Sequence, residues 1–321
     1  MTELTRALVL AGGLTYERDV SLRSGRRVAD ALRQIGVEVT LADADSQLLS
    51  LLDDTRPDAV LIALHGGSGE DGAVRAVLDC ARVAYVGTTP AACRTAFDKP
   101  SAKALVRRAG LDTPDWVAVG HATFRELGAP AVLQLLVSRL GLPLMVKPAA
   151  GGSALGATAV HDAADLPAAM VTCFSYGDTA LVERYIEGLE VSVSVIEPDG
   201  PGSATALPPV EIRPDSGVYD YAARYTAGAT EFFCPARVDD AVTGELTRVA
   251  LAVHATLGLR DLSRSDLRID RAGRVHFLDT NVAPGMTETS LLPLAVAASG
   301  QELGVVCRDL LAAAAQRGPA T

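Results

Sequence analysis

Short apolar runs alternate with segments of helical periodicity along the N-terminal part of the chain. The runs at 6–11 and 59–64 have the composition of buried strands, and each leads directly into glycines. Shorter strands are predicted at 37–41 and 84–87, with helical patterns between them. This order is typical of a parallel sheet, whose ligands bind beyond the carboxyl ends of the strands. The pattern therefore predicts an α/β unit with a binding edge.

Longer helical patterns and further strands follow this unit. Two short helices are expected within 89–109, separated by Asp98-Lys99-Pro100, and a strand is expected within 110–119. The remaining predictions are helices at 131–140, 166–174, 241–257 and 301–315, and strands at 180–183, 191–196 and 210–212.

A small-residue loop at 149–156 follows a strand that ends with Lys147 and Pro148. The residues at 157–160 have the pattern of a returning strand, which predicts an antiparallel strand–loop–strand unit. A P-loop is excluded because its lysine follows the glycines and opens a helix. A glycine loop with its lysine on the strand suits a nucleotide held between sheets. An ordinary glycine hairpin remains the alternative.

Two other segments suggest ligand contacts. Glu183 and Glu190 flank a short connector containing Ile186, where backbone groups can bind adenine while carboxylates reach its amino group and the ribose hydroxyls. The polar, aromatic segment at 219–226 lacks clear periodicity, and we expect it to close on ligands. A surface loop with packed tyrosines is the alternative for this segment.

Acidic and amide side chains converge on a predicted β-hairpin near the C-terminus. Strands at 266–270 and 275–279 are separated by a turn at 270–273. Asp279 and Asn281 are two residues apart and share a face, and the hairpin brings Asp266 beside them. Three oxygen donors without a thiol or imidazole predict a site for Mg²⁺, shared with substrate phosphates. The alternative is that these residues serve only the turn and the solubility of an edge strand.

Composition narrows the class of protein. A chain of 321 residues predicts two or three domains. A net charge of −10 argues against a nucleic-acid partner, which needs a basic face. Five scattered cysteines without a CxxC pair indicate reduced thiols and no zinc site. No apolar run reaches membrane-spanning length, and the N-terminal run is interpreted as a first strand, not as a signal peptide.

Several motifs together resemble the D-alanine–D-alanine ligase family of ATP-grasp enzymes, over nearly the whole chain. They are G-G-x-x-x-E-R-x-V-S-L-x-S-G at 12–25, L-H-G-x-x-G-E-D-G at 64–72, D-K-x-x-x-K at 98–103, V-K-P-x-x-x-G-S at 146–153, Y-D-Y-x-A-R-Y at 219–225, F-C-P-A at 233–236 and N-x-x-P-G-M-T-x-x-S-L at 281–291. The resemblance implies an α/β ATP-grasp fold with an N-terminal parallel-sheet domain at 1–97, a central subdomain at 98–187 and a C-terminal subdomain at 188–321.

The same resemblance implies a nucleotide and metal site. ATP would be bound by a set of residues from the central and C-terminal parts: Lys99, Lys147, Ser153, Glu183, Ile186, Glu190 and Arg224. Two Mg²⁺ ions, with Mn²⁺ as a substitute, would be bound by Asp266, Asp279 and Asn281. The expected reaction passes through an acyl phosphate, in which charge neutralisation and positioning dominate.

Amino-acid substrates are assigned by the resemblance to a second set. Glu17 would take the ammonium group of the first D-alanine, with His65 nearby. Ser153 and Tyr225 would link the lid to Glu17, and Arg264 with the Gly285 region would stabilise the oxyanion. Ser290 and Leu291 would bind the second carboxylate. The implied enzyme is a cytoplasmic homodimer that supplies peptidoglycan synthesis.

Three positions depart from the family pattern. The loop after Pro148 reads Ala-Ala-Gly-Gly-Ser-Ala, where a polar Ser-Arg-Glu-Gly-Ser-Ser is common. Asp279 stands where glutamate is usual. Tyr16 precedes Glu17 where a small residue is common, and we expect it to narrow or reshape the first-substrate pocket. These departures leave open a related ligase with another donor or acceptor. A non-catalytic nucleotide-binding protein is the third hypothesis.

Overall fold

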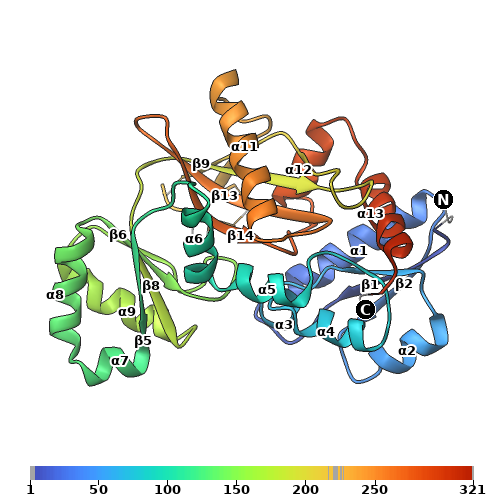
Figure 1. Cartoon of the computed structure of the whole chain (residues 1–321), viewed down its shortest axis with the longest axis horizontal. Helices are drawn as coiled ribbons and strands as arrows, with labels where there is room; N and C mark the ends of the chain where they lie inside the picture. Colours follow the sequence, from blue (N-terminus) through green and yellow to red (C-terminus); the bar gives the residue numbers. More distant parts are fainter. Residues whose placement is uncertain (1–3, 216, 220–222, 225, 227, 320–321) are drawn as a thin grey trace.

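The computed structural model describes residues 4–215, 217–219, 223–224, 226 and 228–319. Within them, three β-sheets come from successive parts of the chain, and helices surround them (Figure 1). Pairing is parallel throughout the first sheet and antiparallel in the other two. The predicted mixed α/β class is confirmed.

The first sheet has the strand order β2-β1-β3-β4 and positions the N-terminal glycine turns. Its elements are β1 (Arg6–Ala11), α1 (Arg18–Gln34), β2 (Glu38–Asp43), α2 (Leu48–Thr55), β3 (Ala59–Ile62), α3 (Gly67–Glu70), α4 (Ala73–Cys80) and β4 (Tyr85–Val86). The hydroxyl of Ser21 in α1 accepts a hydrogen bond from Gly12 N and donates one to Ala63 O, both at 2.8 Å. This serine therefore links the turns that follow β1 and β3.

The second sheet, β5-β8-β6-β7, lies at the opposite end of the molecule from β1 and β2 (Figure 1). The elements from the first sheet to its end are α5 (Pro90–Phe97), α6 (Lys99–Arg108), β5 (Trp116–Gly120), α7 (His121–Glu126), α8 (Ala129–Leu140), β6 (Leu144–Pro148), β7 (Thr158–Val160), α9 (Leu166–Phe174) and β8 (Thr179–Arg184). Strands β6 and β7 pair antiparallel, so the predicted strand–loop–strand unit is confirmed.

The third sheet carries the predicted acidic hairpin on its edge, in the order β12-β11-β9-β13-β14 with β10 beside β9. Its elements and the helices that follow are β9 (Gly188–Ile196), β10 (Thr205–Ala206), β11 (Val210–Pro214), β12 (Thr230–Phe233), α11 (Asp240–Thr256), β13 (Leu262–Asp270), β14 (Val275–Asn281), α12 (Leu291–Ala298) and α13 (Leu303–Arg317). Five short elements, α3, α7, α12, β10 and β12, were not predicted from the sequence, because none has a periodic stretch long enough to recognise.

Two hydrophobic clusters join segments that are distant in the sequence. Ala102 and Val106 of α6 pack with Leu246 of α11 and Leu267 of β13. Leu310 of α13 packs with the first sheet, in a cluster that includes Val9. The core thus ties α6 to the third sheet and the C-terminal helix to the first. The division of the chain at 98 and 188 stays a prediction.

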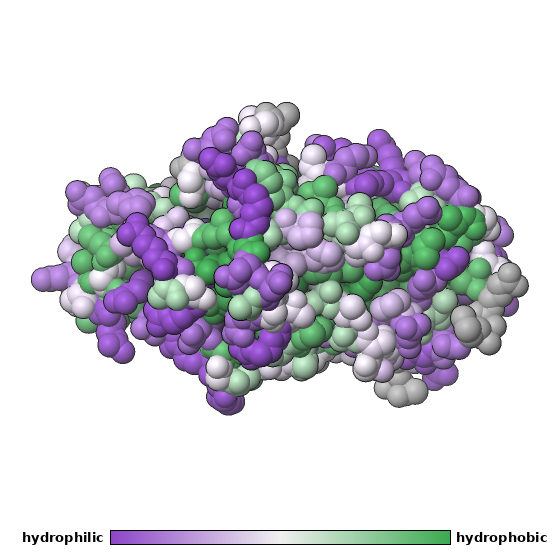
Figure 2. All heavy atoms as spheres, turned by 90° about the horizontal axis from the view of Figure 1, so that it is seen from above, coloured by the Kyte–Doolittle hydropathy of each residue, from purple (hydrophilic) through white to green (hydrophobic). Residues whose placement is uncertain are grey.

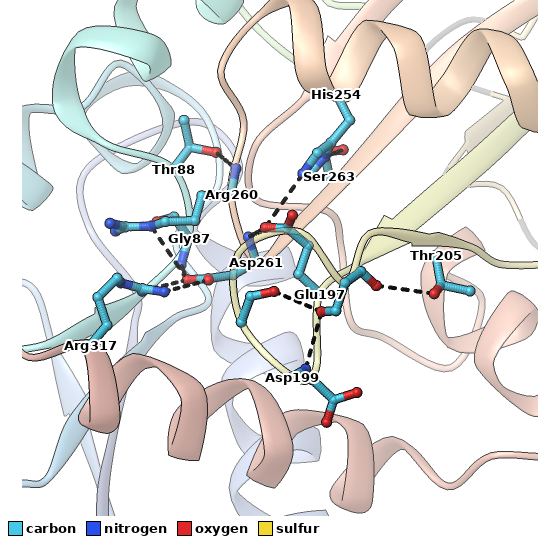
Figure 3. A network of polar contacts seen from close by, with 12 residues as sticks. Gly87, Thr88, Glu197, Asp199, Thr205, His254, Arg260, Asp261, Ser263 and Arg317 are labelled. Carbon is cyan, nitrogen blue, oxygen red and sulfur yellow. Dashed lines mark hydrogen bonds and ion pairs between the residues drawn. The ribbon is translucent and has the colours of Figure 1, made fainter.

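A buried polar network lies where the first and third sheets meet (Figure 3). The carboxylate of Asp261 is fully buried and accepts hydrogen bonds from Gly87 N at 2.6 Å and from Arg317 at 2.8 Å. Asp261 N donates to the carboxylate of Glu197 at 2.9 Å, and His254 pairs with Ser263 at 2.7 Å. The network joins the loop after β4, the start of β13 and the end of α13.

The surface seen from above carries hydrophilic side chains along much of its outline, with hydrophobic ones gathered in patches inside it (Figure 2). Among the described residues, no helix combines the length and apolar character needed to cross a membrane.

Candidate active site

One cavity gathers the predicted site residues from all three sheets. Those that line it are Glu17, His65, Lys99, Lys147, Ser153, Glu183, Ile186, Glu190, Arg224, Arg264, Asp266, Asp279, Asn281, Gly285, Ser290 and Leu291. The predicted Tyr225 lies outside the described residues. The lining also includes Glu70, Tyr185, Arg268 and Thr287, for which the sequence predicted no role, and Tyr219, from the segment expected to close on ligands. The roles of all these residues stay predictions.

The acidic hairpin forms as predicted and brings its oxygen donors together. Asp266 of β13 stands opposite Asp279 of β14, and Arg264 stands opposite Asn281. The turn closes with a hydrogen bond from Gly273 N to Asp270 O at 2.9 Å. No group of three or more His, Cys, Asp or Glu side chains suited to a metal occurs in the described part of the chain. Two carboxylates and an amide fit Mg²⁺ that takes its other ligands from phosphate and water.

Arg264 forms a bidentate pair with Asp266 on the same strand. Its Nε lies 2.8 Å from Oδ1 and its Nη2 lies 2.9 Å from Oδ2. Burial alone would raise the pKa of Asp266, but the guanidinium outweighs it and lowers that pKa to about 2. The predicted metal ligand is therefore ionised at neutral pH, and the predicted oxyanion-binding arginine is held against it.

Lysines from α6 and β6 reach the same cavity. Lys99 Nζ donates to Gly151 O at 2.6 Å and lies 3.3 Å from Asp279 Oδ2. Lys147 Nζ lies 2.6 Å from Glu183 Oε1. Burial alone would lower the pKa of Lys147, but the Glu183 carboxylate outweighs it and raises that pKa. The Lys147 ammonium is thus charged, and both lysines lie at the cavity that also contains the glycine loop and the acidic hairpin, an arrangement suited to phosphate binding.

Glu17 is enclosed by the two glycine loops. Ser153 donates a hydrogen bond to its carboxylate across the cavity. A Cβ on Gly66 would come within 2.4 Å of Glu17 Oε2, and one on Gly152 within 2.9 Å, so only glycine permits this approach. Ser153 itself has a φ of +52°, an uncommon backbone conformation for a residue with a side chain. The glycine loop after β6 therefore contacts the N-terminal part of the chain at Glu17, whose carboxylate is predicted to bind the substrate ammonium.

Comparison of the sequence with known protein families identifies the family to which this chain belongs. The family model described as D-ala D-ala ligase C-terminus matches residues 105–312, more than half of the chain. The chain belongs to the D-alanine–D-alanine ligase family. It is 39% identical to the D-alanine–D-alanine ligase of Anaeromyxobacter sp. (strain Fw109-5) over 310 residues, which is 97% of each chain.

Solved structures of this ligase family share the fold. The crystal structure of D-alanine–D-alanine ligase from Bacillus anthracis is 27% identical, with a TM-score of 0.81 and coverage of 98% of each chain. A structure of that ligase complexed with ATP is 25% identical, with a TM-score of 0.76 over 98% of this chain and 97% of the other. The ATP-grasp fold inferred from the motifs is confirmed.

The carboxylates predicted to hold adenine and ribose form ion pairs within the protein. Arg268 binds the Glu190 carboxylate and donates to Ile186 O at 3.1 Å. Glu183 is paired with lysines and is almost completely buried. Arg268 also lies over the ring of Tyr185, with Cζ 5.1 Å from the centroid. Arg268 belongs to none of the ligase motifs, and its contact with Glu190 arises only from the register between β13 and β9, so the sequence did not indicate it.

Arg224 lies over the ring of Tyr219, with Cζ 4.2 Å from the centroid. Its Nε is buried without a hydrogen-bond partner among the described residues. Arg224 also lines the cavity, and this guanidinium donor suits the predicted contact to the γ-phosphate.

His65 is held as a neutral ring beneath the first-substrate region. Its Nδ1 lies 3.0 Å from Ala283 O and its Nε2 lies 3.0 Å from Ser24 Oγ. Burial lowers its pKa to about 4. Glu70 is also buried, and burial together with the charge of Glu17 raises its pKa to about 8. Glu70 belongs to the motif at 64–72, but the motif alone assigned it no function.

The predicted second-substrate residues form a turn that leads into α12. Ser290 Oγ accepts a hydrogen bond from Thr287 N at 3.0 Å, and a Cβ on Gly285 would meet that hydroxyl at 2.7 Å. Arg27 of α1 holds the same turn by donating to the carbonyl of Thr287. The backbone N–H groups before α12 can face a carboxylate, as at other helix N-termini.

The expectation about Tyr16 is wrong. Its side chain is 83% exposed and does not line the cavity. Its ring instead makes an edge contact with Tyr176, at a centroid distance of 6.2 Å. The backbone turns between Tyr16 and Glu17, so adjacent residues face solvent and cavity. Tyr16 therefore gives no reason to doubt that the first substrate is the usual one of the family.

Proposed function

We propose that this chain joins two molecules of D-alanine into D-alanyl-D-alanine at the expense of ATP. One relationship supports the proposal above all. The phosphate-binding candidates Lys99 and Lys147, together with the acidic hairpin, face Glu17 and the Ser290 turn across a single cavity. A triphosphate and two small amino acids are the substrates that such an arrangement can bring together.

The first step transfers the terminal phosphoryl group of ATP to the carboxylate of the first D-alanine. A bond forms from phosphorus to the carboxylate oxygen, and the bond to ADP breaks. Lys99, Lys147 and Arg224 bind the phosphates, while Glu17 orients the ammonium group. Asp266, Asp279 and Asn281 would hold two Mg²⁺ ions, which supply charge neutralisation on the phosphates when bound.

The second step forms the peptide bond. The neutral amine of the second D-alanine attacks the carbonyl carbon of the acyl phosphate, and inorganic phosphate leaves. Arg264 neutralises the oxygen that becomes negative during this attack. The Ser290 turn fixes the second carboxylate, and the contact between Ser153 and Glu17 keeps water away from the acyl phosphate.

We further propose a cytoplasmic homodimer of three domains, divided near residues 98 and 188, in the synthesis of peptidoglycan precursors. All five cysteines are free, as expected for a reducing compartment. The separate sheets support the three domains. Support for the dimer comes from the family resemblance alone.

The direct test combines purified protein, ATP and Mg²⁺ with D-alanine alone, and separately with D-alanine plus D-serine or D-lactate. We expect phosphate release with D-alanine alone and a dipeptide of matching mass. Asp279→Asn serves as an inactive control, and Asp309→Asn, on the surface of α13, as a matched active one. Product formed only with another acceptor would assign the chain to a related ligase, and ATP binding without any product would contradict ligase activity.

A further inference from the structure

Lysine is rare in this chain and confined to one place. Among 29 basic residues, only Lys99, Lys103 and Lys147 are lysines, and the others are arginines. Lys99 and Lys147 line the candidate nucleotide cavity. Lys103 is four residues after Lys99 on α6, so both side chains leave the same face of the helix. The compact ammonium group of lysine therefore occurs only at or beside the candidate nucleotide cavity, and the basic residues at all other positions are arginines.

Lys103 is the most deeply buried of the three, with no exposed surface. Its Nζ lies 2.7 Å from Glu183 Oε2 and donates to Thr113 Oγ1 at 2.6 Å. The other oxygen of Glu183 lies 2.6 Å from Lys147 Nζ. One carboxylate is therefore shared between two ammonium groups, and the three side chains carry a net charge of one positive unit.

The same contacts tie the lysine to the acidic hairpin. The Thr113 hydroxyl, which accepts a hydrogen bond from Lys103, donates one to Phe277 O at 2.8 Å. Phe277 lies two residues before Asp279 in β14. Lys103 thus connects α6, β8 and the strand that carries the predicted metal ligands. Strand pairing fixes the backbone of Glu183 in β8, and the Lys103 ammonium fixes the direction of its carboxylate.

We propose that Lys103 is a positioning residue of the nucleotide site: it shares the Glu183 carboxylate with Lys147, so that this carboxylate neutralises the Lys147 ammonium only in part and leaves it effective toward phosphate. Without Lys103, Lys147 and Glu183 form a neutral buried pair, which attracts a polyphosphate only weakly. This inference rests on the proposed function, because it requires that Lys147 bind the phosphates of ATP.

The ionisation of the group agrees with this role. Burial lowers the pKa of Lys103 to about 8, against the opposing effect of Glu183. Burial alone would raise the pKa of Glu183, but the two lysines outweigh it and lower that pKa to about 2. All three groups are therefore mainly charged at neutral pH.

The test measures ATP and ADP binding calorimetrically in the presence of Mg²⁺, with the full chain. We expect Lys103→Met to weaken nucleotide binding by roughly tenfold to a hundredfold. In the double variant Lys103→Met/Glu183→Gln, Lys147 is no longer neutralised, and we expect nucleotide affinity close to that of Glu183→Gln alone, which is the reference because Glu183 is itself a predicted nucleotide contact. Arg108→Met, on the exposed side of the same helix, is the matched control and should bind as the wild type does.

A purely structural role for Lys103 predicts another pattern. The double variant would then bind no better than Lys103→Met, and that result would overturn the inference, as would unchanged binding in Lys103→Met. Should Lys103→Met fail to fold, the double variant, which removes both charges together, must still bind nucleotide with an affinity close to that of Glu183→Gln alone. A wild-type protein that binds no ATP would instead refute the proposed function. The KM for D-alanine should stay unchanged in active variants.

Discussion

Asp261 and Arg317 form a two-pronged ion pair, with Nη1–Oδ1 and Nη2–Oδ2 distances of 2.8 Å each, between the start of β13 and the end of the last helix. Asp261 has no exposed surface, and its carboxylate also accepts a hydrogen bond from Gly87 N. The pair therefore joins the C-terminal helix, the strand of Arg264 and the first sheet at one buried point.

We expect Arg317→Met to lower the free energy of unfolding by roughly 3 kcal/mol, because it leaves a buried carboxylate without its main counter-charge. Urea unfolding measures the change. Arg33→Met, which breaks an exposed pair with Asp30, is the control and should cost less than about 1 kcal/mol. Equal losses in the two variants would show that burial does not strengthen the dependence on Arg317.

Arg264→Ala should reduce kcat for dipeptide synthesis by roughly a hundredfold or more, because the proposed donor to the developing oxyanion is lost. The substitution also frees Asp266 from its bidentate partner. The Mg²⁺ concentration that half-saturates ATP binding should therefore not rise. Steady-state kinetics and Mg²⁺ titration separate the two effects. A wild-type kcat would remove Arg264 from the mechanism.

Glu70 should make stability depend on pH. Its pKa in the folded protein, about 8, exceeds the ordinary value of 4.5, so the folded state holds a proton that the unfolded state releases in this range. The free energy of unfolding then falls as pH rises from 4.5 toward 8. Glu70→Gln keeps the shape and removes the titration, so its unfolding free energy should depend less on pH. Parallel pH profiles in urea unfolding would contradict the assignment.

Tyr16 and Glu17 offer a matched pair of adjacent substitutions. Tyr16→Ala should leave the preference for D-alanine over D-serine within about twofold, because the side chain only covers surface beside Tyr176. Glu17→Gln should raise the KM for the first D-alanine more than the KM for ATP, since it removes the charge that faces the ammonium group. Measured KM values for D-alanine, D-serine and ATP test both expectations. A marked change in selectivity in Tyr16→Ala would show that the Tyr16 side chain does shape the substrate pocket.

The hairpin that carries Asp266 and Asp279 could be predicted from the sequence because strand alternation and the turn at 270–273 are local features. The antiparallel unit around the glycine loop was predictable for the same reason. The exact pairing of Asp266 with Asp279 was not predictable, because it depends on a β-bulge between Asp266 and Leu267 that shifts the register set by the turn. The predicted strands and most helices occur within a few residues of the expected positions.

Contacts between distant elements were not predictable in this way. Lys103 was seen only as part of a motif, because its pairing with Glu183 depends on packing between α6 and β8. Arg268 meets Glu190 through strand register. Tyr16 was misplaced because a side-chain direction in a non-periodic turn cannot be derived from spacing.

The sequence by itself determined the family, the fold and most of the residues predicted for the site that line the cavity, because these follow from local patterns and from motifs in a fixed order. Only the tertiary structure decided how the charges are paired. Whether Asp266 faces Arg264, or Glu183 faces two lysines, depends on distances of a few ångströms between elements, and at low dielectric those distances set the ionisation of each group.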